Sequence, residues 1–98
     1  MRLAVLLASP PGGEDARTAR QLAAAARRQG HEVYVFFNAD GVLNAAALAD
    51  LRALGVRLGA CALSARQRGI PMAEGIHWGS QMDWAEAVRD ADRVIVLG

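Results

Sequence analysis

The sequence predicts a small three-layer α/β domain built around a four-stranded parallel sheet. Short blocks of large apolar residues alternate along the chain with segments of helical periodicity, which is the pattern of strands joined by helices. The apolar blocks are continuous and do not alternate with polar residues, which is typical of strands buried on both faces of a parallel sheet. The chain has 98 residues and no long linker or charge run, so we expect residues 1–98 to form one domain.

The first strand and the first helix have clear boundaries. Residues 2–9 are almost entirely apolar, and the Pro10–Gly13 run that follows ends the strand, because proline cannot donate a hydrogen bond to a sheet. The helix begins at Glu14, where two acidic residues suit the positive end of the helix dipole, and two arginines lie in its last turn. Gly30 can then adopt the left-handed conformation that ends many helices.

The next two strands flank a second helix. His31–Phe37 is rich in β-branched and aromatic residues, which favours a strand. After a turn at residues 38–41, Asn44 can cap a helix that ends at Gly55. Val56–Cys61 is the third predicted strand, and it ends in the only cysteine of the chain.

The last third of the chain contains the longest segment without a regular pattern. Residues 64–69 can form a short helical turn, and residues 72–79 are predicted to be an irregular loop, a kind of segment that often carries function. Ser80 and Asp83 have the capping-box spacing that begins a final helix. The side chains predicted to face inward along that helix are Trp84, Ala85, Val88 and Ala91. The final predicted strand is Arg93–Leu97.

The rules for connecting parallel strands suggest how these elements are arranged. Right-handed crossovers favour the strand order 2-1-3-4, a trimmed flavodoxin-like arrangement, with the first helix alone on one face of the sheet and the second and last helices on the other. A ligand or reaction is then expected in the crevice between strands one and three, with Pro10–Gly13 on one wall and Cys61 on the other. A sheet face half covered by one helix would bury its remainder against another subunit.

Composition excludes several classes of function. The formal net charge of +1 gives no electrostatic footprint for nucleic acid, so we expect no direct nucleic-acid partner. All eleven basic residues are arginine, which excludes a P-loop lysine and a Schiff-base lysine. Gly12 and Gly13 precede a helix, but Glu14 and Asp15 place negative charge where a phosphate would bind. No nucleotide, flavin or other cofactor is therefore expected.

The distribution of apolar residues and the single cysteine indicate the compartment. No apolar run approaches the roughly 20 residues that cross a bilayer. The apolar start is short and is followed at once by prolines, unlike a signal peptide. One cysteine also excludes an internal disulfide. We therefore expect a cytoplasmic protein with no membrane partner and a free thiol.

The histidines and tryptophans admit structural and functional interpretations. His31 is expected at the surface, whereas His77 lies in the long loop, where it can act as a proton donor or contact a partner. Two separated histidines and one cysteine lack the spacing of a metal site. Trp84 fits the inner face of a helix and is expected in the core, and Trp78 is expected to contact another subunit or a partner protein.

Cys61 also has two interpretations. A free cysteine is often a small buried hydrophobe with no chemical role. A partly exposed thiol near a helix N-terminus or cations is instead activated, because the thiolate is favoured there. Arg66 and Arg68 follow Cys61 closely enough for one of them to stabilise negative charge on the sulfur.

Residues along nearly the whole chain resemble a known family. The segments that carry the resemblance are Ser9-Pro10-Pro11, Val35-Phe36-Phe37, Asp40-Gly41-Val42, Asn44-Ala45, Cys61–Gly69 and Asp92-Arg93-Val94. They are similar to the DsrE/TusD, or DsrE/DsrF-like, family of sulfur-relay proteins. The resemblance implies a flavodoxin-like fold, assembly as a trimer or hexamer, and a persulfide carried on the cysteine at position 61. Such a cysteine accepts sulfane sulfur from a donor protein and passes it on, for tRNA thiolation or sulfur oxidation.

We therefore predict a sulfur carrier or sulfurtransferase with Cys61, Arg66 and Arg68 as its site residues. A dithiol oxidoreductase is excluded because it needs a second cysteine, whereas a carrier does not. Two alternatives remain open at this point. One is a non-catalytic binding or oligomeric interaction domain in which Cys61 is structural, and the other is a small flavodoxin-like nucleotide binder.

Overall fold

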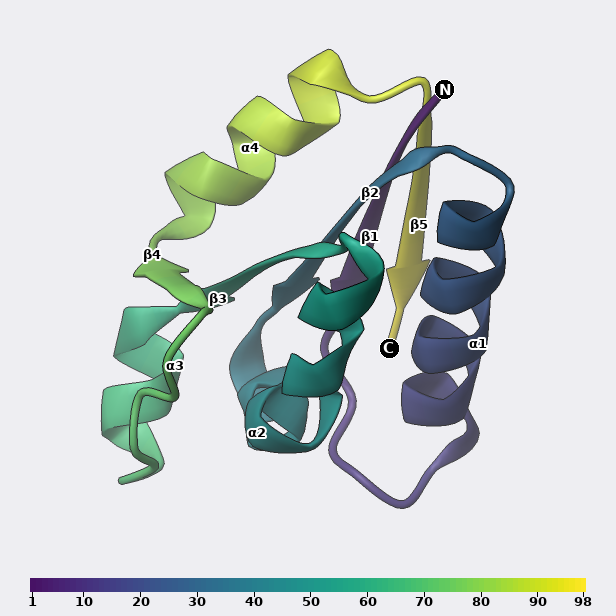
Figure 1. The fold of residues 1–98 in the computed structure, drawn as a ribbon. Coiled ribbons are helices and arrows are strands. Elements are labelled where there is room, and N and C mark those ends of the chain that lie inside the picture. The colour runs from purple at the N-terminus through teal and green to yellow at the C-terminus, as the bar shows by residue number, and fades with distance from the viewer.

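Five parallel strands form the centre of the computed structural model, which describes residues 1–98 (Figure 1). Their order across the sheet is β4-β3-β2-β1-β5. The bounds of the strands are β1 Arg2–Leu7, β2 Glu32–Phe37, β3 Arg57–Cys61, β4 His77–Gly79 and β5 Arg93–Leu97. The α/β class and the parallel sheet predicted from the sequence are thus confirmed.

The strands are joined by helical segments of very different length. The first and last are single α-helices, whereas residues 39–54 form two 3-10 helices around one short α-helix. Their bounds are α1 Glu14–Arg28, η1 Ala39–Asn44, α2 Ala45–Leu48, η2 Ala49–Leu54, α3 Ala62–Gln67 and α4 Gln81–Asp90. None of these helices is both long enough and apolar enough to cross a membrane.

The predicted strand order, 2-1-3-4, is wrong. The third strand in the chain pairs with β2 and not with β1, whose second neighbour is β5. Both orders satisfy the right-handed crossover rule, so that rule alone does not choose between them. The small side chains of α1 favour the observed order, because its buried residues Ala19, Ala23 and Ala24 leave room for residues 39–54 on the same face.

The observed order also changes which helices share a face. Because the chain steps in one direction from β1 to β3, α1 and residues 39–54 cover one face together, and α4 lies alone on the other (Figure 1). Odd-numbered residues of β1 and β2 belong to the larger core on the α1 face. Leu6, Phe36 and Cys61 form a smaller buried cluster on the α4 face, with Trp84 packed against it. The prediction that the first helix is alone on its face is therefore wrong.

Two segments differ locally from the sequence prediction. The predicted loop at residues 72–79 contains β4, which pairs with β3 through the partners Gly59–His77, Ala60–Trp78 and Cys61–Gly79. A strand of three residues that itself includes Gly79 carries too little apolar pattern to be predicted from the sequence. Residues 39–54 do not form one continuous helix, although the segment ends at Gly55 in the left-handed conformation as predicted, with φ 89°.

The start of α4 agrees with prediction, and its inner face agrees only in part. Ser80 and Asp83 form the predicted capping box, with the Asp83 carboxylate accepting from the Ser80 backbone N–H at 2.8 Å. Trp84 is half-buried, and its ring lies 6.1 Å from the ring of Phe36. Ala85 and Val88 are exposed, because the face that meets the sheet consists of the positions Trp84, Ala87 and Ala91.

On the α4 face of the sheet, no helix covers strand β5. Val94 and Val96 of β5 point to the α4 face, in register with Ala4 and Leu6, and are 43% and 61% exposed. The other edge of β5 has no strand beside it. The structure therefore leaves an apolar strip along β5, which we call the β5 face.

Candidate functional site at the carboxyl edge of the sheet

Cys61 lies where β3 ends and α3 begins. It is the last residue of the strand and the N-cap of the helix, with φ −79° and ψ 113°. Its Sγ accepts a hydrogen bond from the backbone N–H of Ser64 at 3.4 Å. The cysteine thus occupies the position that a serine or aspartate usually takes at a helix start, and the sulfur satisfies a backbone donor there.

The thiol is more enclosed than the sequence suggests. Cys61 is 6% exposed and packs with Leu6 and Phe36, with Trp84 also against the cluster. At the carboxyl edge of the sheet, this cluster adjoins backbone and polar side chains from the segment after β2 and from the start of α4. The surroundings of the sulfur are therefore apolar on one side and polar on the other.

Hydrogen bonding and burial act on the thiol in opposite directions. Burial raises the pKa of Cys61, but hydrogen bonds from the side chain and backbone of Ser64, the backbone of Leu63 and the side chain of Gln81 lower it more. The resulting pKa lies below the ordinary value for cysteine. The thiolate, which is the nucleophilic form, therefore forms more readily here than in an unfolded chain.

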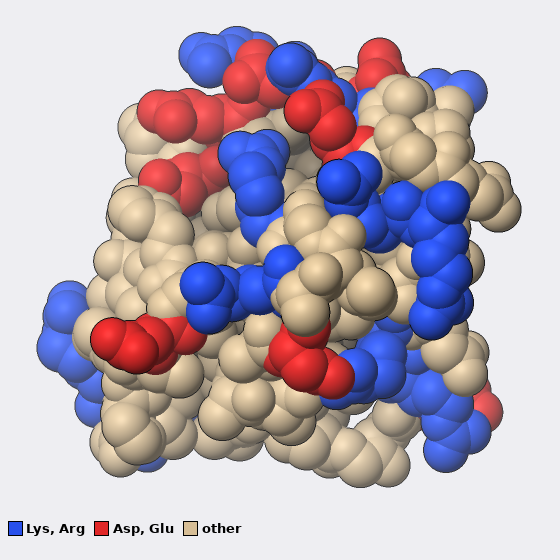
Figure 2. Space-filling view, viewed as in Figure 1, with Lys and Arg blue, Asp and Glu red and all other residues tan.

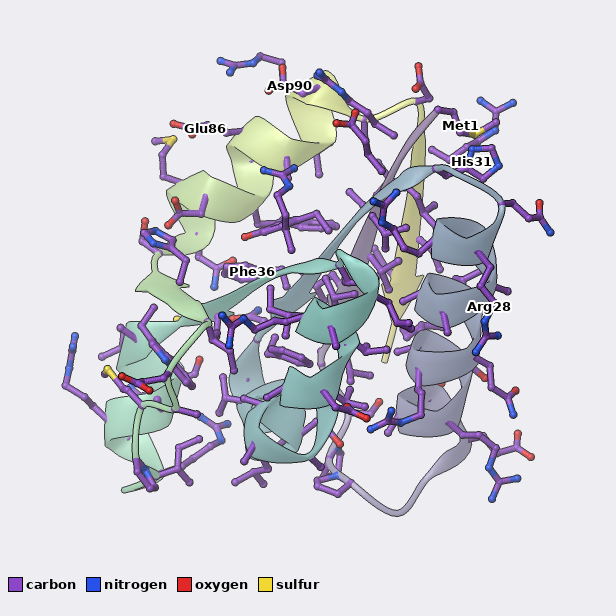
Figure 3. The ribbon with its side chains drawn as sticks, in the orientation of Figure 1. Met1, Arg28, His31, Phe36, Glu86 and Asp90 are labelled. Atoms are coloured by element: carbon purple, nitrogen blue, oxygen red, sulfur yellow. The ribbon has the colours of Figure 1, made fainter.

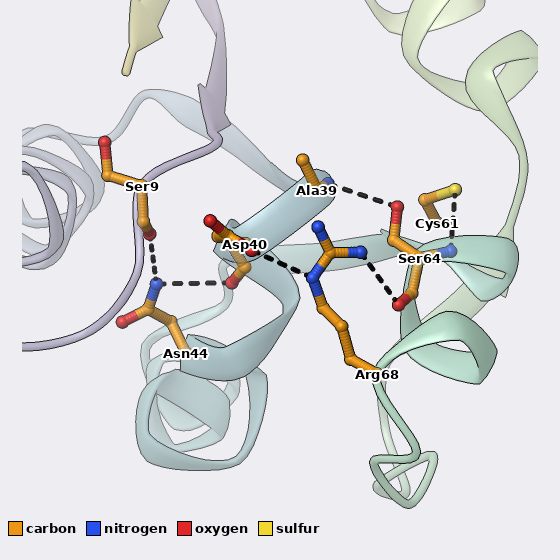
Figure 4. Close-up of polar contacts among 8 residues, drawn as sticks. Ser9, Ala39, Asp40, Asn44, Cys61, Ser64 and Arg68 are labelled. Atoms are coloured by element: carbon orange, nitrogen blue, oxygen red, sulfur yellow. Dashed lines mark hydrogen bonds and ion pairs between the residues drawn. The ribbon is translucent and has the colours of Figure 1, made fainter.

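A chain of hydrogen bonds continues from the thiol to the end of β2 (Figure 4). The Ser64 hydroxyl accepts from the backbone N–H of Ala39 at 3.2 Å. Ala39 has φ 50°, the left-handed region that an alanine rarely adopts. Its amide is thereby directed toward α3. Ser64 thus connects the loop after β2 to the thiol.

A second set of contacts holds the loop after β2 in place. Arg68 Nε donates to Asp40 Oδ1 at 2.9 Å, and another of its nitrogens donates to the Ser64 carbonyl at 3.2 Å (Figure 4). Asn44 is 2% exposed, and its side chain donates to the carbonyls of Ser9 and Gly41. The sequence predicts that the Asn44 side chain caps a helix, but it makes no such hydrogen bond. It instead joins η1 to the loop after β1.

One side chain connects α4 to β2 across this edge. Gln81, the first residue of α4, donates from Nε2 to Asn38 Oδ1 at 2.6 Å. Asn38 directly follows β2, and the strand that ends in Cys61 lies between β2 and β4. Gln81, Asn38 and Ser64 are not predicted as site residues from the sequence. The contact of Gln81 with Asn38 depends on a strand order that local patterns do not specify. The contact of Ser64 with Cys61 has the local spacing of a helix cap, which could have indicated it.

The structure does not bring the other predicted site residues, Arg66 and Arg68, into contact with the Cys61 thiol. Arg68 lies beside Ser64 but is occupied with Asp40, and Arg66 is exposed on α3. Neither arginine is among the causes of the pKa shift of Cys61. Because β2 separates β1 from β3, the wall beside Cys61 is formed by the loop after β2, and the expected wall at Pro10–Gly13 is wrong.

The histidines and Trp78 contact groups other than the thiol. His31 contacts the N-terminal amine at 3.2 Å, and His77 pairs with Asp83 at 3.3 Å on the groove side of β4. The indole of Trp78 donates to the Ala73 carbonyl at 2.9 Å and packs against the larger core. Trp78 is thus an internal anchor of its own loop. No three His, Cys, Asp or Glu side chains gather as metal ligands would.

A groove lies at the opposite end of the sheet from Cys61. This groove of about 510 Å³ runs beneath α4 and is bordered by Arg2, Tyr34, Arg57 and acidic side chains of the helix. Figure 3 shows Glu86 and Asp90 projecting from α4, with Phe36 on the sheet below. Figure 2 shows acidic atoms gathered over α4 and arginines along α1, with both signs between them. The aromatic pair of Phe36 and Trp84 separates the groove from the thiol.

Comparison with protein families matches residues 1–97 to the DsrE/DsrF-like family. The chain belongs to the DsrE/DsrF-like family. Members of this family generally work in sulfur relay. A comparison with curated protein sequences gave no match.

Solved structures agree with this family assignment at the level of the fold. The chain is similar to the ychN protein from E. coli, with a TM-score of 0.80 and 24% identity, covering 98% of this chain and 99% of that one. It is also similar to BT1422 from Bacteroides thetaiotaomicron, a conserved protein of unknown function, with a TM-score of 0.74 and 14% identity over 97% and 93% of the two chains. At these identities the two likenesses establish the fold alone.

Proposed function

We propose that this DsrE/DsrF-like protein is a sulfur carrier that holds a persulfide on Cys61. The observation that carries the proposal is the position of the thiol at the end of β3, hydrogen-bonded to the Ser64 backbone N–H at 3.4 Å. Hydrogen bonding lowers the pKa of the thiol even though it is enclosed. A structural cysteine in an apolar core has the opposite property, because burial without hydrogen bonds raises its pKa.

The proposed transfer needs only one cysteine. The Cys61 thiolate attacks the outer sulfur of a donor persulfide, the sulfur–sulfur bond of the donor breaks, and the donor leaves as a thiolate. Cys61 then carries the sulfur as a persulfide. An acceptor thiolate attacks that outer sulfur and releases the Cys61 thiolate again. Each step exchanges one sulfur–sulfur bond for another, so no external oxidant or reductant is required.

Two arginines complete the proposed site in different ways. Arg68 acts on the geometry, because it joins Asp40 and the Ser64 carbonyl and so fixes the turn that places Ser64 against the sulfur. Arg66 is exposed on α3, where it is available to the negative charge of an incoming persulfide. The persulfide outer sulfur is acidic, so a nearby guanidinium would stabilise its charged form.

Loading with sulfur tests the proposal directly. The purified protein is incubated with inorganic polysulfide, excess donor is removed, and intact-mass spectrometry is used to detect a one-sulfur adduct. We expect the adduct on the wild-type chain and none on the Cys61→Ser variant, because no other cysteine is present. A wild-type chain that stays unmodified, under conditions that load a known carrier protein, would refute the proposal.

The main alternative is an interaction domain in which Cys61 only fills space, and its enclosure at 6% exposure favours that alternative. The two functions differ in the reactivity of the thiol. A carrier thiolate reacts with iodoacetamide near neutral pH in the folded protein, whereas a structural thiol reacts only after unfolding.

We also propose that the protein forms a homo-oligomer, a trimer or hexamer, in the cytoplasm. The β5 face supports assembly, because Val94 and Val96 leave apolar area in water that a second copy would bury. A free thiol with no disulfide partner suits a reducing compartment. The proposed partners are sulfur donor and acceptor proteins.

A further inference from the structure

One hydrogen bond joins two elements that are distant in the sequence, at the strand end that bears Cys61. Gln81 Nε2 at the start of α4 donates to Asn38 Oδ1 after β2 at 2.6 Å. The strand that ends in Cys61 lies between β2 and β4, so this bond spans the strand end that bears the thiol. Gln81 itself is exposed, yet Cys61 beneath it is 6% exposed.

The chemistry of the Gln81 side chain allows a second contact. A primary amide nitrogen carries two hydrogens, and the bond to Asn38 uses one of them. The other is free to donate toward the sulfur. Consistent with this, hydrogen bonding from the Gln81 side chain is among the causes that lower the pKa of Cys61, after those from Ser64 and Leu63.

We propose that Gln81 is a positioning residue for Cys61. While it is bonded to Asn38, the Gln81 side chain covers the thiol from solvent and donates its second amide hydrogen to the thiolate. Its part in sulfur transfer rests on the proposed function, but its effect on the thiol does not. Because only one hydrogen bond fastens the cover, and Gln81 is exposed, a docking protein can displace it without unfolding any element.

Few charges near the thiol compete with this effect. The elements packed against Cys61 bring mainly apolar groups, and Tyr34, the titratable side chain beside this cluster, is neutral near pH 7 because burial raises its pKa to about 12. Among the adjoining elements, Arg68 pairs with Asp40 and Asp83 contacts His77. Arg66 on α3 is exposed, and Arg57 on β3 lies over the ring of Tyr34. Substitution of Gln81 removes none of these groups. A change in the titration of Cys61 after substitution of Gln81 therefore reports on Gln81 itself.

The rate of alkylation by iodoacetamide, followed from about pH 6 to about pH 10, separates the two parts of the proposal. The midpoint of the profile gives the pKa of the thiol, and the plateau at high pH gives the accessibility of the thiolate. For Gln81→Ala we expect the midpoint to rise by about half to one pH unit, because a donor to the thiolate is lost. We also expect the plateau to rise about threefold or more, because the cover is removed.

A second variant tests the cover alone. Asn38→Ala leaves the Gln81 amide free to donate to the sulfur, so we expect a raised plateau with a midpoint close to that of the wild type. Gln21→Ala, the same substitution at an exposed position on α1, is the matched control and should leave both quantities unchanged.

An unchanged midpoint and plateau in Gln81→Ala would overturn the proposal, as would an unchanged plateau in Asn38→Ala. The measurement uses no sulfur donor. Its failure is therefore distinct from a failure of the protein to load persulfide.

Discussion

Two side chains on the α4 face, the buried Cys61 and the half-buried Tyr34, have pKa shifts of opposite direction. Cys61 and Tyr34 both lie against the cluster of Leu6 and Phe36, where burial disfavours a negative charge. Cys61 receives backbone and side-chain donors at the helix start, and its pKa is lowered. Tyr34 has no such donors, and burial, with the nearby Asp83 carboxylate, raises its pKa to about 12. Hydrogen bonding, and not burial alone, thus decides the direction of the pKa shift in each of the two residues.

The titration of Tyr34 can be measured without a label. It is the only tyrosine, so tyrosinate absorbance in the ultraviolet reports on it alone. We expect a midpoint near 12 in the folded protein and near 10 after denaturation. Because the folded pKa lies above the unfolded pKa, the stability that neutral Tyr34 contributes is present below about pH 10 and is lost as the pH rises toward 12.

Tyr34→Phe is the control for this stability change. It removes the titrating hydroxyl and keeps the ring, so its free energy of unfolding should fall less between these two pH values than that of the wild type. A folded-state midpoint close to 10 would contradict the burial of the hydroxyl described above.

At the scale of elements, local sequence signals and tertiary packing determine different features. The bounds of α1 follow from charges and glycines that act within one turn, and both ends lie where the sequence predicts. β4 has three residues, and its identity as a strand comes from pairing with β3 and not from its own pattern. The same holds for the candidate site. Cys61 can be predicted because it ends an apolar block. Gln81 and Asn38 come together because the strand order β4-β3-β2 places the segments after β4 and β2 on either side of Cys61.

The junction between β1 and η1 depends on a glycine. A Cβ at Gly41 would collide with the carbonyl group of Leu7, and the backbone N–H of Asn38 donates to that same carbonyl at 3.0 Å. Moving the two backbones apart would disturb this hydrogen bond and the one from the Gly41 N–H to the Asn38 carbonyl at 2.8 Å. The Asp-Gly-Val segment that contributes to the family resemblance therefore has a structural reason for its glycine.

Replacing Gly41 by alanine should destabilise the protein by about 1–3 kcal/mol, the range typical of forcing extra atoms into a packed interior. Urea unfolding followed by tryptophan fluorescence measures this change. Gly13→Ala is the matched control, because a Cβ there meets no atom within 4 Å and φ is −101°. Equal stability of the two variants would show that the loop after β2 does not need the close approach to Leu7.

At the scale of the whole molecule, the sheet has two unequal edges. β4 is short and is followed at once by α4, whereas β5 presents five residues with no strand beyond them. Natural sheets usually protect such an edge with charges or proline, and the β5 sequence Arg-Val-Ile-Val-Leu has a single charge at its start. Because α4 packs over β1 and over the cluster of Leu6, Phe36 and Cys61, the apolar side chains of β5 stay in water on a single chain.

A charge on the β5 face should therefore dissociate the proposed homo-oligomer. We expect the wild-type protein to have an oligomeric mass by size-exclusion chromatography with light scattering, and Val96→Asp to weaken association at least about tenfold, because the charge would have to be desolvated in the interface. Leu54→Asp is the control, since Leu54 is 40% exposed on η2, on the opposite face of the sheet. A wild-type chain that stays monomeric at every concentration tested, or a Leu54→Asp variant that dissociates as readily as Val96→Asp, would show that the β5 face does not hold the copies together.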